Sequence, residues 1–462
     1  RIDDYRTIGL TGPEDGTGHF AALCRNNLDS QKQNAVAGGA YGLGKAVFWR
    51  ASKFSTVLFC SNLSEPYVGP DNVVKQDLRI IGKADLAWHE INGTEYAGPG
   101  WFGVVKNGED GKPSRAVSVW NNQALAKDLF LDREDVYGTS ILVVGFQDTS
   151  SDVARSLNDI AEEFECAVAK NFWPALLSGR MSVKVSVFDG QEQKSSIMVD
   201  PSRYYSSYVD AVRKYRLGEI TEKLKYEGDV VVKQIPLTIP KRHRDPEHPP
   251  ITDEAVLLVR RASDDAVGED LNQVAFYRGQ EMIILYQNLK MLVSGGVPFN
   301  AVVLCGRAAG HSESNLHAER FLRSAEPPAH DRWVLTPELK INYAPGSGTS
   351  LQEFFRRVRD EIRELVKPTY DDLDDGPRAL KELLRLGTVN RNAHSDSPRV
   401  IIDQSRTRIT ESGSWQVFVR VKLPDDRCWR AVPALVFAAE TGGGTRVSWK
   451  ITPIAGCICD GD

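Results

Sequence analysis

Hydrophobic and polar positions follow two different periods along this chain. Between residues 55 and 146, short apolar runs such as "STVLFCS" (55–61) are separated by turns rich in Gly, Asn and Pro. This pattern predicts short strands in a mostly antiparallel sheet. Residues 153–177 change to the helical period, which predicts one long helix with an apolar face. That face consists of Leu157, Ile160, Phe164, Val168 and Phe172.

The two periods alternate through the rest of the chain and predict an α+β protein. A second amphipathic helix is expected at 351–366, with apolar residues on one face and solvated arginines on the other. From Pro398 onward every segment has the strand pattern, which predicts a small all-β domain, sandwich-like in form. Further strands are predicted in "GRMSVKVSVFDG" (179–190), "GDVVVKQIPLTIP" (228–240), "EAVLLVRRAS" (254–263), "QVAFYRGQEMIIL" (273–285) and "FNAVVLCGRAAG" (299–310).

Composition narrows the class of protein. A chain of 462 residues is long enough for several domains, and its net charge of −5 argues against a globally basic nucleic-acid binder. No apolar run reaches the roughly 18 residues of a membrane helix. The seven cysteines are scattered and odd in number, which predicts a reduced, cytoplasmic protein. Its few histidines are not clustered, so we expect no metal site built on histidine.

The segment "GGAYGLGKAV" (38–47) has the spacing of a phosphate-binding loop, and two interpretations compete. A Walker loop needs a buried strand before it and a Ser or Thr after the lysine. The preceding "NNLDSQKQNAVA" is polar, and Ala46 follows Lys45. The other interpretation places glycines at a helix N-terminus, where backbone N–H groups and the helix dipole bind phosphate. We favour it, with a loop that only packs helix on sheet as the alternative.

The order of several segments points to a family. An acidic pair and two glycines ("DDYRTIGLTG", 3–12) come first, then a polar stretch suited to a lid, then the glycine loop entering a helix, and then "GTSILVV" (138–144). This order resembles the GHKL ATPases, which include gyrase B, heat-shock-ninety chaperones, histidine kinases, MutL and MORC proteins. The resemblance covers residues 1 to about 146. It implies an antiparallel-rich sheet with helices on one face, followed by a ribosomal-protein-like transducer domain.

The resemblance also implies which residues bind ATP. Asp4, or Asp3 in the alternative register, would accept a hydrogen bond from the adenine amino group. Gly9 and Gly12 would let the chain pass beside the base, and Thr139 would bind near the adenine from the sheet. The glycine loop would bind the phosphates, with Lys45 adding charge. The complete expected set is Asp4, Gly9, Gly12, Gly39, Tyr41, Gly42, Leu43, Gly44, Lys45 and Thr139.

Sensing of the γ-phosphate is expected from the transducer domain. Residues 314–333 form a basic, Pro-containing segment after an apolar strand, which we interpret as a polar loop. Arg323 and His330 are the candidate sensors, and Arg278 is the rival. Surface charge or intrachain pairing is the alternative for each of them. The family's catalytic glutamate and Mg²⁺-binding asparagine belong to a helix expected before Arg1, so no catalytic base or metal ligand is assigned.

The predicted organisation has four parts, and the implied activity is that of an ATP-gated dimeric clamp. The expected cofactors are ATP and Mg²⁺, and the expected partners are a second copy of the chain, DNA, and nuclease or helicase proteins of a restriction or anti-phage system. A chaperone-like remodelling ATPase and a nucleotide-binding interaction module without hydrolysis remain alternatives. The parts are an ATP-binding domain (1–148), a transducer domain (149–350), a helical linker (351–397) and a β-domain (398–462).

Overall fold

The structure is a computed structural model in which the chain divides into two compact units, 1–369 and 370–462. In the second unit it describes only the backbone of four strands. The described residues are 1–26, 44–69, 72–108, 111, 113–134, 136–148, 155–243, 249–263, 266, 270–289, 297–367, 401–409, 415–422, 436–438 and 444–446.

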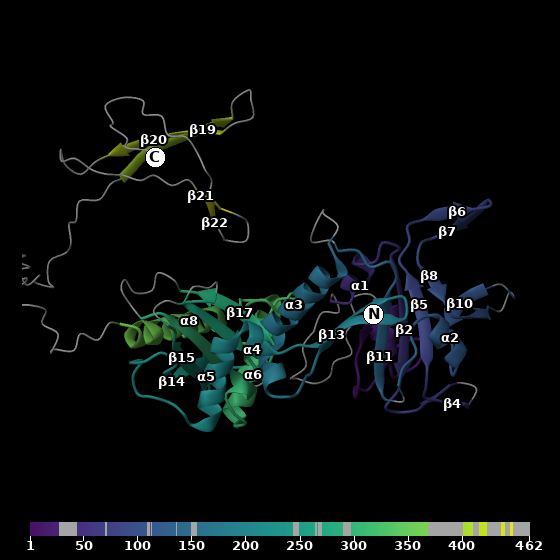
Figure 1. Ribbon diagram of the computed structural model, residues 1–462, viewed down its shortest axis with the longest axis horizontal. Helices are drawn as coiled ribbons and strands as arrows, with labels where there is room; N and C mark the ends of the chain where they lie inside the picture. The colour runs from purple at the N-terminus through teal and green to yellow at the C-terminus, as the bar shows by residue number, and fades with distance from the viewer. Residues whose placement is uncertain are drawn as a thin grey trace, which may run out of the picture. The chain divides into compact units, whose positions relative to one another are not determined.

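A five-stranded sheet organises the first part of the chain (Figure 1). All of its neighbouring strands are antiparallel, as the sequence predicts. The predicted strand at 55–61 is confirmed as β2, the central strand. In spatial order the strands are β1 (Ile2–Asp3), β11 (Gly138–Val143), β2 (Thr56–Asn62), β5 (Arg79–Ala84) and β8 (Gly100–Phe102).

Alternate residues of β2 enter two separate cores, because successive side chains of a strand point to opposite faces. Val57 and Phe59 pack with Phe20 in one core, whereas Leu58 and Cys60 pack in the other. The first core includes η1 (Ala21–Arg25), a short π-helix, and the second includes α2 (Gln123–Asp128). Short elements at the rim are α1 (Ala46–Arg50), β3 (Tyr67–Val68), β4 (Val74–Lys75), β6 (His89–Ile91), β7 (Thr94–Tyr96), β9 (Val104–Asn107) and β10 (Pro113–Val117).

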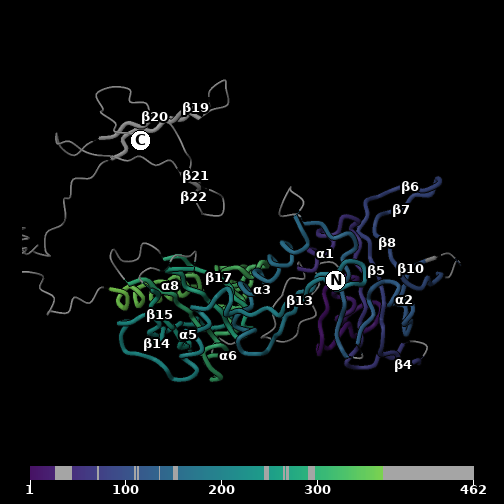
Figure 2. Tube along the Cα trace, viewed as in Figure 1, coloured from purple at the N-terminus to yellow at the C-terminus, as the bar shows by residue number. Residues whose placement is uncertain are grey.

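A second five-stranded sheet follows, and Figure 2 traces the chain into it. Its pairs are antiparallel except for β16 and β18, which are parallel. In spatial order the strands are β14 (Val230–Ile239), β15 (Ile251–Arg261), β18 (Phe299–Leu304), β16 (Gln273–Tyr277) and β17 (Ile283–Asn288). A separate hairpin precedes it, formed by β12 (Lys184–Asp189) and β13 (Glu192–Met198).

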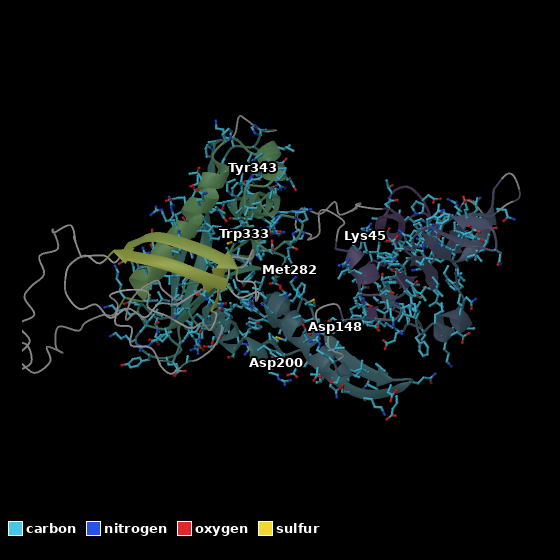
Figure 3. The ribbon with its side chains drawn as sticks, turned by 90° about the horizontal axis from the view of Figure 1, so that it is seen from above. Lys45, Asp148, Asp200, Met282, Trp333 and Tyr343 are labelled. Carbon is cyan, nitrogen blue, oxygen red and sulfur yellow. The ribbon has the colours of Figure 1, made fainter. Side chains whose placement is uncertain are left out.

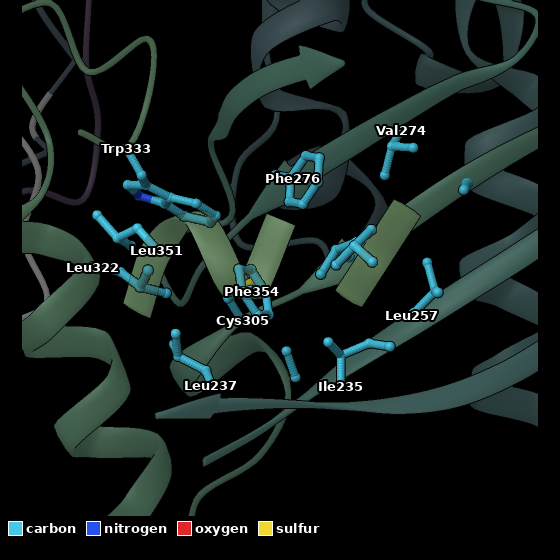
Figure 4. Packing of buried hydrophobic residues seen from close by; sticks show 14 of the residues in the cluster. Ile235, Leu237, Leu257, Val274, Phe276, Cys305, Leu322, Trp333, Leu351 and Phe354 are labelled. Carbon is cyan, nitrogen blue, oxygen red and sulfur yellow. The ribbon is translucent and has the colours of Figure 1, made fainter. Parts of the chain in front are cut away.

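Helices cover both faces of this second sheet. On one face Phe276 and Leu257 pack with Phe354, Leu322 and Trp333, as Figure 4 shows. The other face packs against Trp173 and Tyr208 from two further helices. The predicted helices at 153–177 and 351–366 are confirmed as α3 and α8. The helices are α3 (Leu157–Leu177), α4 (Pro201–Tyr204), α5 (Ser206–Leu217), α6 (Glu313–Ser324), α7 (Pro337–Asn342) and α8 (Ser347–Leu365), with the 3-10 turn η2 (Gly306–Ala308).

Two local predictions differ from the structure. The segment 273–285 forms two strands joined by a turn at Arg278–Met282, because Arg278 is drawn into a buried ion cluster instead of continuing the ladder. The segment 314–333 is helical from its first residue through Ser324, as α6, instead of a loop. Ser312 begins this helix with a capping box, accepting a hydrogen bond from Asn315 N at 3.1 Å.

The α+β class is confirmed. In the second unit the described backbone contains two hairpins, β19 (Ile401–Ile409) with β20 (Trp415–Lys422), and β21 (Val436–Ala438) with β22 (Gly444–Arg446). Within the described residues, no helix combines the length and apolar composition needed to cross a bilayer.

A cluster of buried charges joins β16 to α6 and the segment after it. The fully buried Arg278 donates to Glu326 from Nε at 2.5 Å and Nη2 at 2.9 Å, and to Glu319 from Nη1 at 2.5 Å. Trp333 Nε1 donates to Glu326 at 3.1 Å, and His330 Nδ1 lies 2.9 Å from it. Burial alone would raise the pKa of Glu326, but Arg278, His330 and Trp333 outweigh it and hold that pKa below its ordinary value.

Glu326→Gln is expected to lower the free energy of unfolding by about 3–5 kcal/mol at pH 7, because it breaks a buried ion pair. The depressed pKa means that this contribution is complete above the ordinary value of 4.5 and is lost as the pH falls through the folded-state value. The difference between wild type and variant should therefore shrink below about pH 4.5. Urea unfolding across the pH range measures it. Glu313→Gln, on a side chain 90% exposed, is the control and should change stability by less than about 0.5 kcal/mol. A pH-independent difference would contradict the prediction.

Candidate functional site

Asp4 is held against Thr139 at the point where β1 leaves the sheet. The two residues are 135 positions apart, yet Thr139 N donates to Asp4 Oδ1 at 2.6 Å and Asp4 N donates to the Thr139 carbonyl at 2.9 Å. Thr7 Oγ1 donates to the same carboxylate oxygen at 2.8 Å. Among the described residues, no donor is bonded to Oδ2 of Asp4. Thus one oxygen positions the carboxylate while the other is available to a ligand.

Asp3 and Asp4 lie on opposite sides of the chain and have different partners. Asp3 pairs with Ser140 in the β1–β11 ladder, and its carboxylate accepts from Arg1 Nε at 2.7 Å and from Ser140 Oγ. Asp4 is instead bonded to Thr139. The structure therefore brings together Asp4 and Thr139, two residues of the expected set, and gives Asp3 a separate ion pair.

Ser61 connects this pair to the glycines that follow Asp4. Its Oγ accepts a hydrogen bond from Leu10 N at 2.8 Å and donates to the Gly138 carbonyl at 2.8 Å. The same hydroxyl lies 3.4 Å from Thr139 Oγ1. Ser61 was not among the site residues expected from the sequence. The available signal was a hydroxyl residue at the end of an otherwise apolar strand.

Close approaches of the backbone explain two glycines. Gly9 has φ +70°, and a Cβ there would lie 2.8 Å from Ser61 Oγ and overlap the Asn62 carbonyl oxygen. Gly12 has φ +97°, and its Cβ would lie 3.0 Å from Gly18 Cα. Neither position admits a larger residue without movement of backbone. Packing thus requires glycine at both positions: Gly9 lies against the end of β2, and Gly12 lies against Gly18.

The glycine loop is only partly described. Gly39, Tyr41, Gly42 and Leu43 lie outside the described residues. Gly44 is exposed, directly before α1.

Lys45, labelled in Figure 3, donates from Nζ to the Ala22 and Asn26 carbonyl oxygens. These carbonyls lie in and just after η1, the π-helix. The lysine therefore neutralises a helix carboxyl end, which is a favourable place for a cation.

A second buried arginine lies beneath the glycine segment. Arg79 has no exposed side-chain surface, and its Nη1 donates to the carbonyls of Leu10 at 2.8 Å and Gly12 at 2.7 Å. Its guanidinium lies 3.4 Å from the ring centroid of Phe20 and pairs with Glu14 at 3.1 Å. Burial alone would raise the pKa of Glu14, but Arg79 and further hydrogen bonds hold it below the ordinary value. Sequence analysis missed both residues.

The three candidate γ-phosphate sensors have different environments. All three guanidinium nitrogens of Arg278 donate to Glu319 and Glu326. The His330 side chain is 13% exposed and borders the same cluster through Glu326. Arg323 is half-buried in the last turn of α6. The structure thus brings Arg278 and His330 together on one carboxylate.

No cluster of three or more metal-ligating side chains occurs in the described part of the chain. The expected Mg²⁺ ligand was placed before Arg1, so this finding leaves the expectation untouched. What the described residues do offer is a polar cluster of Asp4, Thr139 and Ser61, with Gly9 and Gly138 beside it. The unbonded oxygen of Asp4 suits a polar ligand that presents an N–H donor.

Gly9→Ala is expected to destabilise the protein by about 2–5 kcal/mol, combining left-handed strain with forced overlap against Asn62 and Ser61. Gly16→Ala is the matched control, since Gly16 has φ +89° but open space around its missing Cβ. It should cost only the strain, about 1–2 kcal/mol. Urea unfolding of the two variants compares them. Equal costs would show that close approach at Gly9 is unimportant.

Comparisons of the chain with protein-family models, with curated proteins and with solved structures found no significant match.

Proposed function

We propose that residues 1–148 bind ATP in the manner of a GHKL ATPase, with adenine read by Asp4. The observation that carries this proposal is the 2.6 Å hydrogen bond from Thr139 N to Asp4 Oδ1. The sequence resemblance named these two residues as neighbours of one base, and they are 135 positions apart in the chain. A fixed carboxylate with one unbonded oxygen is the acceptor that the adenine amino group needs.

The partners of each acidic residue support Asp4 over Asp3 as the proposed acceptor. In both residues the bonded carboxylate oxygen is Oδ1, but Asp3 is already ion-paired with Arg1, whereas the described partners of the Asp4 carboxylate are the neutral Thr7 hydroxyl and Thr139 N–H. Asp4 is therefore the better acceptor for a ligand.

Phosphate binding is assigned to the glycine loop and Lys45. Lys45 Nζ donates to the carbonyls of Ala22 and Asn26. We propose that a bound triphosphate offers this ammonium stronger, charged acceptors. We assign no general base and no Mg²⁺ ligand to the described residues, so the proposal for them is ATP binding.

The larger function we propose is an ATP-gated dimeric clamp on DNA, in a defence or restriction setting with nuclease or helicase partners. ATP would favour the closed dimer by binding it more tightly than the open one, at about 1.4 kcal/mol per tenfold shift. The net charge of −5 keeps the chaperone-like alternative in view. Stimulation of hydrolysis by DNA with steep salt dependence separates the two, because phosphate contacts release counterions.

Asp4→Asn is expected to weaken ATP binding about tenfold to a hundredfold, because a hydrogen bond to a charged acceptor is worth about 1.5–3 kcal/mol. The amide can still accept from Thr139 N through its oxygen, but its NH₂ group would then meet the adenine amino group. Asp3→Asn has the same chemistry on the other side of the chain and should change affinity less than about threefold. Calorimetry with a non-hydrolysable analogue measures both. A larger loss in Asp3→Asn would move the acceptor by one residue.

Arg323→Ala and His330→Ala test the proposed γ-phosphate sensing. Each should reduce affinity for an ATP analogue modestly while leaving ADP affinity nearly unchanged, since ADP lacks the sensed group. Dimer closure, followed by sedimentation, should fall more steeply because it needs both domains docked. Arg332→Ala is the control, as this side chain is 65% exposed beside Asp331. Equal losses for ADP and the ATP analogue would mean ordinary destabilisation instead of sensing.

A further inference from the structure

Arg133 is a buried arginine whose side chain contacts the same segment as the proposed adenine acceptor. Its side chain has no exposed surface. Nη2 donates to the Asp4 carbonyl at 2.6 Å, and Nη1 donates to Ser140 Oγ at 2.7 Å. The guanidinium also lies 3.9 Å from Asp3 Oδ1 and 5.1 Å from the ring centroid of Tyr5. One side chain therefore touches three consecutive residues of the acidic segment.

These contacts lie where they can fix the position of Asp4. The β1–β11 ladder contains only two residue pairs, Ile2 with Ile141 and Asp3 with Ser140. Asp4 is the first residue beyond that ladder. Because a guanidinium is a planar fork, its two nitrogens fix the relative position of Ser140, on β11, and Asp4, at the end of β1.

Gly138 gives a second, independent observation at the place where Arg133 contacts Asp4. Its φ is +139°, and a Cβ there would lie 2.6 Å from Asp4 Oδ1 and 2.8 Å from Arg133 Nη2. A side chain at residue 138 would thus displace the carboxylate, the guanidinium or both. Because residue 138 has no side chain, both groups can lie within 3 Å of the same point.

Hydrogen bonding alone does not account for the complete burial of the Arg133 side chain. Its Nε is buried and, within the described residues, has no partner. An unsatisfied buried donor opposes folding. A position kept at such a cost is a candidate for a functional constraint, and the nearest functional group is Asp4.

We propose that Arg133 is the positioning residue for base recognition, fixing Asp4 so that its free oxygen accepts from the 6-amino group of adenine and rejects the 6-oxo group of guanine. This inference rests on the proposed function. Guanine presents an acceptor where adenine presents a donor, so a well-placed carboxylate repels it. If Asp4 is free to move, the site can accommodate either base. The preference for ATP over GTP should then fall more than the affinity for ATP.

The experiment compares binding of non-hydrolysable ATP and GTP analogues to the full chain by calorimetry, alongside urea unfolding. Arg133→Lys keeps the charge but loses the fork, and it should reduce the preference for ATP over GTP at least tenfold. Arg79→Lys is the matched control. Arg79 is equally buried but holds Leu10 and Gly12 instead of Asp4, so its substitution should shift both affinities by the same factor.

Three outcomes overturn the proposal in distinguishable ways. An unchanged ATP preference in folded Arg133→Lys removes the positioning role, and so does an equal loss of preference in Arg79→Lys. If Arg133→Lys does not fold, Ser140→Ala releases one arm of the fork while keeping the arginine, and it should reduce the preference about threefold; an unchanged preference there is equally decisive. Failure of the wild type to bind or to prefer ATP instead removes the proposed function itself.

Discussion

The hydrogen bond from Thr139 N to Asp4 Oδ1 is the constraint on which the candidate site depends. It closes a loop of the chain 135 residues long, and it does so where backbone pairing is almost exhausted. Loop closure of this length is costly in entropy, and a single bond does not offset that cost. The cores on both faces of β2 do so instead. The bond then selects which residues meet at the sheet edge.

Two buried arginines each hold one end of the chain segment from Asp4 to Gly12. Arg133 holds the acidic end through the Asp4 carbonyl, and Arg79 holds the glycine end through the carbonyls of Leu10 and Gly12. Carbonyl oxygens left without partners inside a protein cost free energy, so a buried guanidinium with several donors suits an irregular segment. Neither arginine comes from the segment that it holds. The site is therefore a property of the folded sheet and not of the motif alone.

The sequence predicted much of this fold because its periodicities are local. The strand at β2, the helices α3 and α8, and the strand β14 follow from patterns within a few residues. The turn that begins at Arg278 was not predicted, and the carboxylates that bind Arg278 there, Glu319 and Glu326, are 41 and 48 residues away in the chain. The helix α6 was missed because its polar residues and the prolines beyond it resemble a loop. At the site, Asp4 and Thr139 were named from a resemblance, whereas Ser61, Arg79 and Arg133 were missed. Their roles arise from contacts across 51, 69 and 129 residues.

Two glycines near the site, Gly9 and Gly138, have a simple physical origin. Gly9 is required because Ser61 and Asn62 occupy the space of its Cβ, and Gly138 is required because Asp4 and Arg133 do. Each glycine is required by a neighbouring group that lies elsewhere in the chain. A sequence pattern shows the glycine but not the neighbour that excludes a side chain there. For this chain, the identity of residue 138 and the presence of Arg133 are two parts of a single requirement, because the same small space must hold the guanidinium and the carboxylate together.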